Sequence, residues 1–195
     1  MADDYFKTGS WKKRDEYYTP PILVKAILPY VNPSHTVWCP FDTKRSEFVK
    51  MLEDNGNDVI ATHIWNGKDF FEYEPKKDYD VIISNPPFTR KLDVLRRCYD
   101  ELKSPFALLL GLPVLNYQNV GRFFTEEEHR KLQLLIVDKK VSYDGNTSSF
   151  NTSYFCNDVL PRDLMFSHLE HNNSNDDHVK SEMYEEANKR NIDIH

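Results

Sequence analysis

The chain has 195 residues, of which 39% are hydrophobic and 29% are charged, and its formal net charge is −6 at pH 7. This is the composition of a soluble globular protein, and the length suits one domain with a sizeable core. No stretch approaches the roughly 18–20 apolar residues that span a bilayer, and no apolar run follows the first charged residues, so we expect neither a membrane span nor a secretory signal. The negative charge counts against strong sequence-independent binding of nucleic acid.

Cysteine and histidine usage bears on compartment and metal binding. The three cysteines lie far apart: Cys39, Cys98 and Cys156. Their odd number and wide spacing argue against a disulfide framework or a zinc knuckle and favour a reducing compartment, so we expect the cytoplasm. The histidines near the C-terminus (His168, His171 and His178) have no cysteine or carboxylate at ligand spacing, and we therefore expect no metal site.

In the first half of the chain, helices and strands are predicted to alternate. Proline at positions 20 and 21 can open a helix over 21–31, with Ile22, Ala26, Ile27 and Tyr30 on one face. A strand is expected over 36–41, a helix over 46–56 that ends at Gly56, and a second strand over 58–64. The segment 69–75 (DFFEYEP) is a candidate for a short third strand.

The second half continues the alternation. Residues 79–84 (YDVIIS) form the clearest strand, apolar on both faces as in a parallel sheet. A helix over 91–102, a strand over 106–112 and a capping box at Thr125 and Glu128 that opens another helix are expected next. Three further strand candidates and the loop 145–153 predict an antiparallel hairpin at the edge of the sheet; the strands lie at 132–138, 153–156 and 164–169. This order is typical of an α/β domain with a mostly parallel sheet.

We expect residues 1–170 to form the domain, with 1–14 mobile. Residues 171–195 are expected to be a polar acidic tail, in which 177–190 has the pattern of a weak helix.

The motif that carries chemistry follows the strand 79–84 directly: Asn85, Pro86, Pro87 and Phe88. Ligands of open α/β sheets bind beyond the carboxyl ends of strands, which is where this motif lies. Two prolines stiffen the turn and remove two backbone donors. The side-chain oxygen of Asn85 and the carbonyl of Pro86 are then two fixed acceptors that can hold both hydrogens of an amino group, and Phe88 offers a face for a flat base. A turn that merely ends the strand is the competing interpretation.

With these residues the sequence resembles the adenine-N6 DNA methyltransferases, in particular small phage-type members, over about residues 15–166. Asn85 to Phe88 match the catalytic NPPF/NPPY motif of that family. The resemblance implies a Rossmann-like S-adenosylmethionine-dependent methyltransferase sheet, mostly parallel with an antiparallel edge hairpin. The resemblance further implies a donor-binding set of Tyr18, Thr19 and Pro20, which pack on the donor, and Asp69 with Phe70, which receive its adenine. It also implies aromatic residues that sandwich the extruded base, Phe150 and Tyr154.

The loop after the first strand departs from the family pattern. The family has an acidic residue, then Pro-Phe and a glycine-rich turn. Here Cys39 stands in the acidic position, Pro40 and Phe41 match, and no glycine follows before Gly56. Asp42 could supply the missing carboxylate to the donor, or it could pair with Lys44 and Arg45. The second strand ends in Thr62 and His63 where the family has an acid for the ribose; a buried neutral His63 is the competing interpretation to a ribose contact.

Basic pairs give an acidic chain a route to a polyanion. They are Lys12-Lys13-Arg14, Lys44-Arg45, Arg90-Lys91, Arg96-Arg97 and Lys139-Lys140. Each is compatible with ordinary surface charge. In this fold the turns after the first and fourth predicted strands emerge on the rim of the site, so Arg90 and Lys91 are expected to contact the substrate. The partner expected is DNA, with a possible second subunit for target recognition.

The sequence thus predicts methyl transfer from S-adenosylmethionine to the N6 amine of adenine in DNA. Two alternatives stay open. One is methylation of RNA adenine or of a protein glutamine; glutamine-directed relatives favour NPPY, so Phe88 favours adenine. The other is a catalytically silent binding module, which the missing glycine turn and the acidic tail support.

Overall fold

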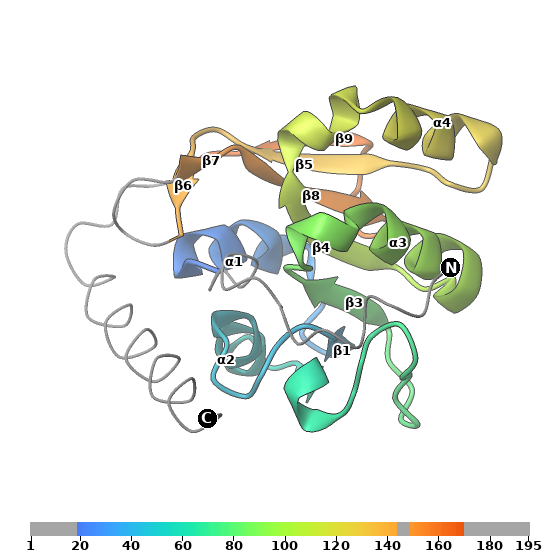
Figure 1. The fold of residues 1–195 in the computed structure, drawn as a ribbon. Helices are drawn as coiled ribbons and strands as arrows, with labels where there is room; N and C mark the ends of the chain where they lie inside the picture. Colours follow the sequence, from blue (N-terminus) through green and yellow to red (C-terminus); the bar gives the residue numbers. More distant parts are fainter. Residues whose placement is uncertain (1–18, 144–148, 170–195) are drawn as a thin grey trace, which may run out of the picture.

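The computed structural model describes residues 19–143 and 149–169 of the chain (Figure 1). Within these residues, seven strands form one sheet in the order β2-β1-β3-β4-β8-β5-β9. Their bounds are β1 (Thr36–Cys39), β2 (Asp58–Ala61), β3 (Val81–Ser84), β4 (Phe106–Gly111), β5 (Gln133–Val137), β8 (Thr152–Asn157) and β9 (Leu164–Ser167).

Most strand pairs are parallel. Strand β1 pairs in parallel with β2 and β3, β3 with β4, and β5 with β9, whereas β8 is antiparallel to β4 and β5. The mostly parallel Rossmann-like sheet predicted from the sequence is therefore confirmed. Its antiparallel strand lies between β4 and β5, inside the sheet, and the edge strand β9 is parallel to its neighbour. The short strands β6 (Val141–Ser142) and β7 (Ser149–Phe150) form a separate antiparallel pair across the polar loop.

Helices cover both faces of the sheet (Figure 1). Helices α1 (Pro21–Ile27) and α2 (Glu47–Asp54) pack on one face, and α3 (Lys91–Arg96) and α4 (Gln118–Glu126) on the other. A π-helical segment, Arg97–Leu102, continues α3, so the helix expected over 91–102 is present. The 3-10 turns are Leu28–Tyr30, Ile64–Asn66, Phe88–Arg90 and Leu112–Asn116.

The core explains why the central strands are apolar throughout. Successive residues of β1 point to opposite faces, so Val37 and Cys39 join the cluster under α1 and α2, while Trp38 joins the cluster under α3. All three side chains are fully buried. Helix α2 ends at Asp54 and is capped by Asn55; the glycine predicted to stop it, Gly56, follows with a φ of +98°, a conformation that L side chains rarely adopt.

Two predicted elements are wrong. The segment 69–75 is a turn, because the Asp69 side chain and carbonyl capture nearby backbone N–H groups that a strand would use. The capping box at Thr125 does not open a helix. Thr125 lies in the last turn of α4, where its hydroxyl donates to the carbonyls of Gly121 and Arg122; Glu127 is extended and a turn follows at residues 128–129.

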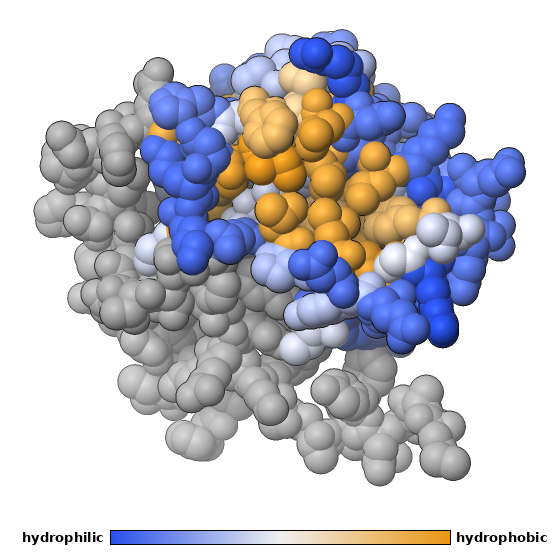
Figure 2. Space-filling model, turned by 90° about the horizontal axis from the view of Figure 1, so that it is seen from above, coloured by the Kyte–Doolittle hydropathy of each residue, from blue (hydrophilic) through white to orange (hydrophobic). Residues whose placement is uncertain are grey.

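The sheet ends on one side in an exposed apolar strand. Figure 2 looks onto the molecule from above the view of Figure 1 and shows an apolar area bordered by hydrophilic residues. At the β9 edge, Leu164 and Phe166 are 53% and 69% exposed, and their spacing of two places both on one face. Among the helices of the described residues, none has the length and apolar character needed to cross a membrane.

Candidate active site

The loops that carry the predicted site residues meet at one edge of the sheet. Strands β1, β2, β3 and β4 are parallel, so they end together at what we call the carboxyl edge. The register places Cys39 beside Ala61, and Trp38 beside Ile82. The loops that begin at Pro40, Thr62 and Asn85 are therefore neighbours in space, which is the location where ligands of such sheets bind.

A buried hydrogen bond joins the loop after β1 to the end of β3. The hydroxyl of Ser84 donates to the Oδ2 atom of Asp42, and Ser84 directly precedes Asn85. Asp42 is 7% exposed and Ser84 is fully buried. Burial raises the pKa of Asp42 from 3.8 to about 6, although the hydroxyls of Ser84 and Ser46 act in the opposite direction by stabilising the carboxylate. The observed partner of Asp42 is thus the neighbouring strand, a contact that neither sequence interpretation foresaw.

The end of β2 is held by a second set of hydrogen bonds. The amide of Asp42 donates to the Thr62 carbonyl at 3.2 Å, and the amide of Thr62 donates to the Cys39 carbonyl at 3.0 Å. On the side-chain level, Trp38 Nε1 donates to Thr62 Oγ1 at 2.9 Å. These bonds hold the loops after β1 and β2 together.

His63 is neutral near physiological pH. Burial lowers its pKa from 6.5 to about 4. Its Nδ1 atom accepts a hydrogen bond from the backbone amide of Trp65 at 3.2 Å, and the two rings lie 4.2 Å apart between centroids. An accepting Nδ1 leaves the proton on Nε2. The structure therefore agrees with a neutral, partly buried His63, and the ribose contact stays a prediction.

The turn after β3 is stiff and mostly shielded. Pro86 is buried, and the Oδ1 atom of Asn85 is shielded from solvent, although the residue as a whole is half-buried. Pro87 is extended, with φ −58° and ψ 132°, and a 3-10 turn begins at Phe88. The Arg90 amide donates to the Pro87 carbonyl at 3.3 Å. The Phe88 side chain lies outside the described part of the structure, so its predicted stacking role stays a prediction.

Aromatic side chains back the loop that was predicted to receive the donor's adenine. Phe70 is 2% exposed, and its ring centroid lies 4.8 Å from that of Phe41 and 5.5 Å from that of Trp38. Asp69 Oδ1 accepts the Phe71 amide at 3.0 Å. Because Phe70 is buried, it supports Phe41, and the half-buried Phe41 is the ring nearer to solvent.

The two basic residues after the turn contact aromatic rings. The Arg90 guanidinium lies 3.5 Å from the Phe71 centroid and pairs with Asp93 at 3.3 Å. Lys91 Nζ lies 4.9 Å from the Tyr117 centroid. Arg90 therefore connects the turn after β3 to the ring of Phe71, and Lys91 connects that turn to Tyr117 in the loop after β4.

Tyr154 is wrong as a base-binding residue. Its side chain is fully buried, and its hydroxyl donates to the Leu23 carbonyl at 2.9 Å. Burial also raises its pKa well above the usual value. Because this ring of β8 is buried in the core under α1, neither of its faces is accessible to a base.

The other predicted residues lie at the margins of the description. Thr19 and Pro20 are buried just before α1. The carbonyl of Leu23 in α1 accepts from Tyr154, and Tyr154 pairs with Leu109 of β4, so the start of α1 lies near the second half of β4. Tyr18, the residues 1–14 and the tail 171–195 lie outside the described residues. The backbone of Phe150 pairs with Val141 in the β6–β7 ladder, and its side chain is outside the description.

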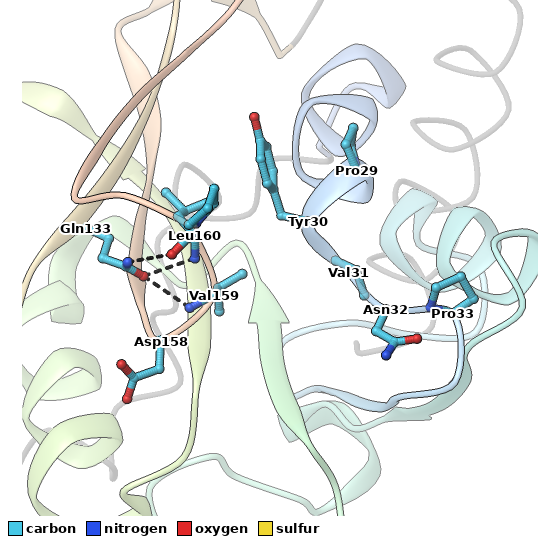
Figure 3. A pocket seen from close by; sticks show the side chains of 10 residues that line it. Pro29, Tyr30, Val31, Asn32, Pro33, Gln133, Asp158, Val159 and Leu160 are labelled. Carbon is cyan, nitrogen blue, oxygen red and sulfur yellow. Dashed lines mark hydrogen bonds between the residues drawn. The ribbon is translucent and has the colours of Figure 1, made fainter.

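An open pocket occurs at the opposite edge of the sheet (Figure 3). Its volume is about 670 Å³, and residues 29–33 line one side of it while Gln133 and residues 158–161 line the other. Residues 29–33 precede β1, Gln133 is the first residue of β5, and residues 158–161 lie between β8 and β9. The pocket therefore lies where β1, β5 and β9 begin. Its size does not make it the active site, because the loops with the candidate chemistry are at the other edge.

Comparisons with known proteins bear on the fold. No protein-family model and no curated protein sequence matches the chain. Among solved structures, a modification subunit of a putative type I restriction enzyme from Vibrio vulnificus is similar, with a TM-score of 0.53 and 12% identity over 93% of this chain and 54% of that one. A type I restriction-modification methyltransferase subunit from Streptococcus thermophilus has a TM-score of 0.46 and 12% identity over 87% of this chain and 52% of that one.

A third similar structure is a putative class I S-adenosylmethionine-dependent methyltransferase from Listeria monocytogenes, with a TM-score of 0.41 and 10% identity over 85% of this chain and 67% of that one. The chain spans about half the length of the first two proteins. At 12% identity, the likeness to the Vibrio vulnificus subunit concerns the fold alone, a Rossmann-like α/β sheet.

Sequence reasoning missed three features of this edge. It did not foresee the Asp42–Ser84 hydrogen bond, or the exposure of Trp65 and Tyr117, which are both 49% exposed. Trp65 and Tyr117 follow strand ends within a few residues, and this position was the available signal. No local pattern marks the Asp42–Ser84 contact.

Proposed function

We propose that the chain transfers a methyl group from S-adenosylmethionine to the N6 amine of adenine in DNA. The observation that carries the proposal is the position of the Asn-Pro-Pro turn. It follows a strand buried on both faces, at the carboxyl edge of a methyltransferase-type sheet, and the Asp42–Ser84 hydrogen bond ties it to the loop after β1. In the proposal, this hydrogen bond holds the donor loop and the acceptor turn together.

The acceptor turn supplies the groups that would bind the amine. In the proposal, the Asn85 side-chain oxygen and the Pro86 carbonyl accept the two amine hydrogens, orient the nitrogen lone pair and stabilise its developing positive charge. Proline at 86 and 87 keeps these acceptors in place. Phe88 stacks on the base. No strong base is needed, because the nitrogen loses its proton only after it has become cationic.

The residues on the other side of the network fit a cationic donor with a flat base. S-adenosylmethionine, when bound, supplies the methyl group on a positively charged sulfur. Asp42 would provide a carboxylate for that charge, and Pro40, Phe41 and the loop of Asp69 and Phe70 would form the wall beside the donor; the Phe41 and Phe70 rings contact each other and Phe70 is buried. Tyr18, Thr19 and Pro20 are proposed to close the donor site from the start of α1.

DNA and a further chain are proposed as partners. Arg90 and Lys91 follow the acceptor turn and would contact phosphates. A duplex target base must be extruded to reach the turn. We propose that residues 1–170 form the catalytic domain and that a second subunit provides target recognition.

A parallel methylation assay tests the proposal. The protein is incubated with radiolabelled S-adenosylmethionine and DNA, RNA or a glutamine-containing protein extract, with the Asn85→Ala variant as control. The expected result is label in DNA, recovered as N6-methyladenine, and none with the variant. Label in RNA or protein would replace the DNA substrate. Donor binding without transfer to any of the three would support a silent binding module.

A further inference from the structure

Two large aromatic side chains stand exposed at the carboxyl edge, one on each side of the acceptor turn. Trp65 follows β2, and Tyr117 follows β4 after the 3-10 turn Leu112–Asn116; each is 49% exposed. The methylation proposal uses neither of them. They differ in their neighbours, because Trp65 contacts His63 whereas Tyr117 contacts Lys91.

The contact with Lys91 shows that Tyr117 lies close to the Asn-Pro-Pro turn. The Lys91 side chain reaches the Tyr117 ring with Nζ at 4.9 Å from its centroid. Lys91 opens α3 directly after the 3-10 turn Phe88–Arg90, which continues from the two prolines. Because β3 and β4 are parallel neighbours, the loops after them emerge next to each other. An ammonium group and a half-exposed ring are thus combined next to the proposed position of the target base.

This combination is the one that single-stranded nucleic acids require. A ring face stacks on a base of any sequence, and a nearby cation pairs with the phosphate of the same nucleotide. An aromatic ring is useful when a base is extruded, because the base that remains next to it in the strand loses a stacking contact. A protein ligand would not need a phosphate-binding cation three residues after the proposed amine-binding motif Asn85–Phe88.

We propose that Tyr117 stacks on the nucleobase adjacent to the target adenine and that Lys91 binds the phosphate between the two. This inference rests on the proposed function for the position of the target base. The stack would hold the strand open at the site and would be insensitive to the identity of the adjacent base. The Tyr117 backbone supports the role, because its carbonyl accepts the amides of Val120 and Gly121, both at 3.0 Å, and so anchors the residue at the start of α4.

Binding of a fluorescent single-stranded oligodeoxynucleotide, without S-adenosylmethionine, tests the inference. Tyr117→Leu, which keeps a bulky side chain but removes the ring, should weaken binding about tenfold, the scale of one base–aromatic stack. Tyr117→Phe keeps the ring and should bind like the natural protein. Trp65→Leu is the matched control, since Trp65 has the same exposed fraction, and it should leave affinity unchanged. Thermal unfolding of each variant shows that the fold is retained.

Two readouts separate stacking from charge. Lys91→Met should lower the slope of log affinity against log salt by about 0.7, the value for one phosphate of a single strand, whereas Tyr117→Leu should leave the slope unchanged. With 2-aminopurine beside the target adenine, fluorescence should be quenched by the natural protein and by Tyr117→Phe, and not by Tyr117→Leu.

Wild-type affinity in Tyr117→Leu, an equal loss in Trp65→Leu, or no binding of the oligonucleotide by the natural protein overturns the inference. Methylation of DNA by the natural protein alongside any of these results would leave the proposed function standing. If Tyr117 stacks on the base but the protein methylates no substrate, the proposed function is overturned and the stacking inference stands.

Discussion

The two edges of the sheet end in loops of opposite character. At the carboxyl edge, polar side chains such as Asp42 and Ser84 are buried at strand ends, and burial changes the pKa values of Asp42 and His63. At the amino edge there is a pocket of about 670 Å³, yet its Gln133 side chain is bonded to the loop that lines the pocket. Gln133 accepts the amides of Val159 and Leu160 at 3.1 and 3.0 Å and donates to the Leu160 carbonyl at 2.7 Å (Figure 3).

This difference separates a hollow from a candidate site. The side chain of Gln133 spends its hydrogen-bonding capacity on one loop and keeps that loop in place. At the carboxyl edge, by contrast, the hydrogen bond between Ser84 and Asp42 joins the end of β3 to the loop after β1, and the stiff Asn-Pro-Pro turn begins directly after it. Buried polar side chains and shifted pKa values, and not cavity volume, are therefore the basis for proposing the site at the carboxyl edge.

The largest effect is expected from Asn85→Ala. The substitution removes one of two proposed acceptors of the amine, and it should lower kcat for methyl transfer about 100-fold or more, the scale known for loss of one preorganised hydrogen-bonding group. Donor affinity, measured by calorimetry, should stay nearly the same, and Asn85→Asp should retain part of the activity because a carboxylate still accepts. Wild-type rates in Asn85→Ala would mean that the chemistry lies elsewhere.

The second effect concerns charge at the carboxyl edge. Replacement of Arg90 and Lys91 by glutamate should weaken binding of duplex DNA at least about tenfold at low salt and lower the salt slope by about 2. Replacement of Lys139 and Lys140 is the matched control, because these residues follow β5 at the same edge but three strands away from β3. Filter binding over a salt series measures both. Equal losses in the two double variants would remove the argument for a substrate phosphate at the acceptor turn.

A third prediction is that the Asp42 carboxylate lowers the stability of the fold at neutral pH but strengthens donor binding. Its folded-state pKa of about 6 exceeds the usual 3.8, so the folded protein holds the proton more tightly than the unfolded chain. This contribution to stability is present below about pH 4 and is lost as the pH rises through about 6. Asp42→Asn should therefore unfold with a free energy about 1–3 kcal/mol higher at pH 7, and with no difference at pH 4.

The same variant should bind S-adenosylmethionine about tenfold more weakly, as expected for loss of one charge-assisted contact. Urea unfolding and calorimetry at the two pH values check both statements. A variant with unchanged stability at pH 7 would show that Asp42 is not a destabilised buried acid.

The smallest effect on activity is expected at the amino edge. Gln133→Ala leaves the amides of Val159 and Leu160 without their present acceptor, which should lower the free energy of unfolding by about 1–3 kcal/mol. Methyl transfer by the folded variant should stay at the wild-type rate. A large loss of kcat would show that the pocket of Figure 3 takes part in function.

Much of the fold could be predicted because its signals are local. The apolar runs that became β1, β3 and β4 are each ended by proline, asparagine or glycine, and Gly56 follows α2 with a positive φ. The Asn-Pro-Pro turn was located for the same reason, since two prolines cannot continue a strand. The failures were also local. The segment 69–75 has strand-like residues, yet Asp69 hydrogen-bonds its own turn, and Thr125 matched a capping box while it ended a helix.

Contacts between distant residues had no such signal. The Asp42–Ser84 hydrogen bond joins residues 42 positions apart, and the Tyr154–Leu23 bond joins residues 131 apart. Both depend on strand order and register, which place β1 beside β3 and bring β8 under α1. In strands buried on both faces, polarity does not alternate, and it cannot show which side chain points to the core and which to a ligand. The chain's periodicity and turn residues thus specified the strands and the Asn-Pro-Pro turn, whereas packing across the sheet determined that Asp42 supports that turn and that Tyr154 is a core residue.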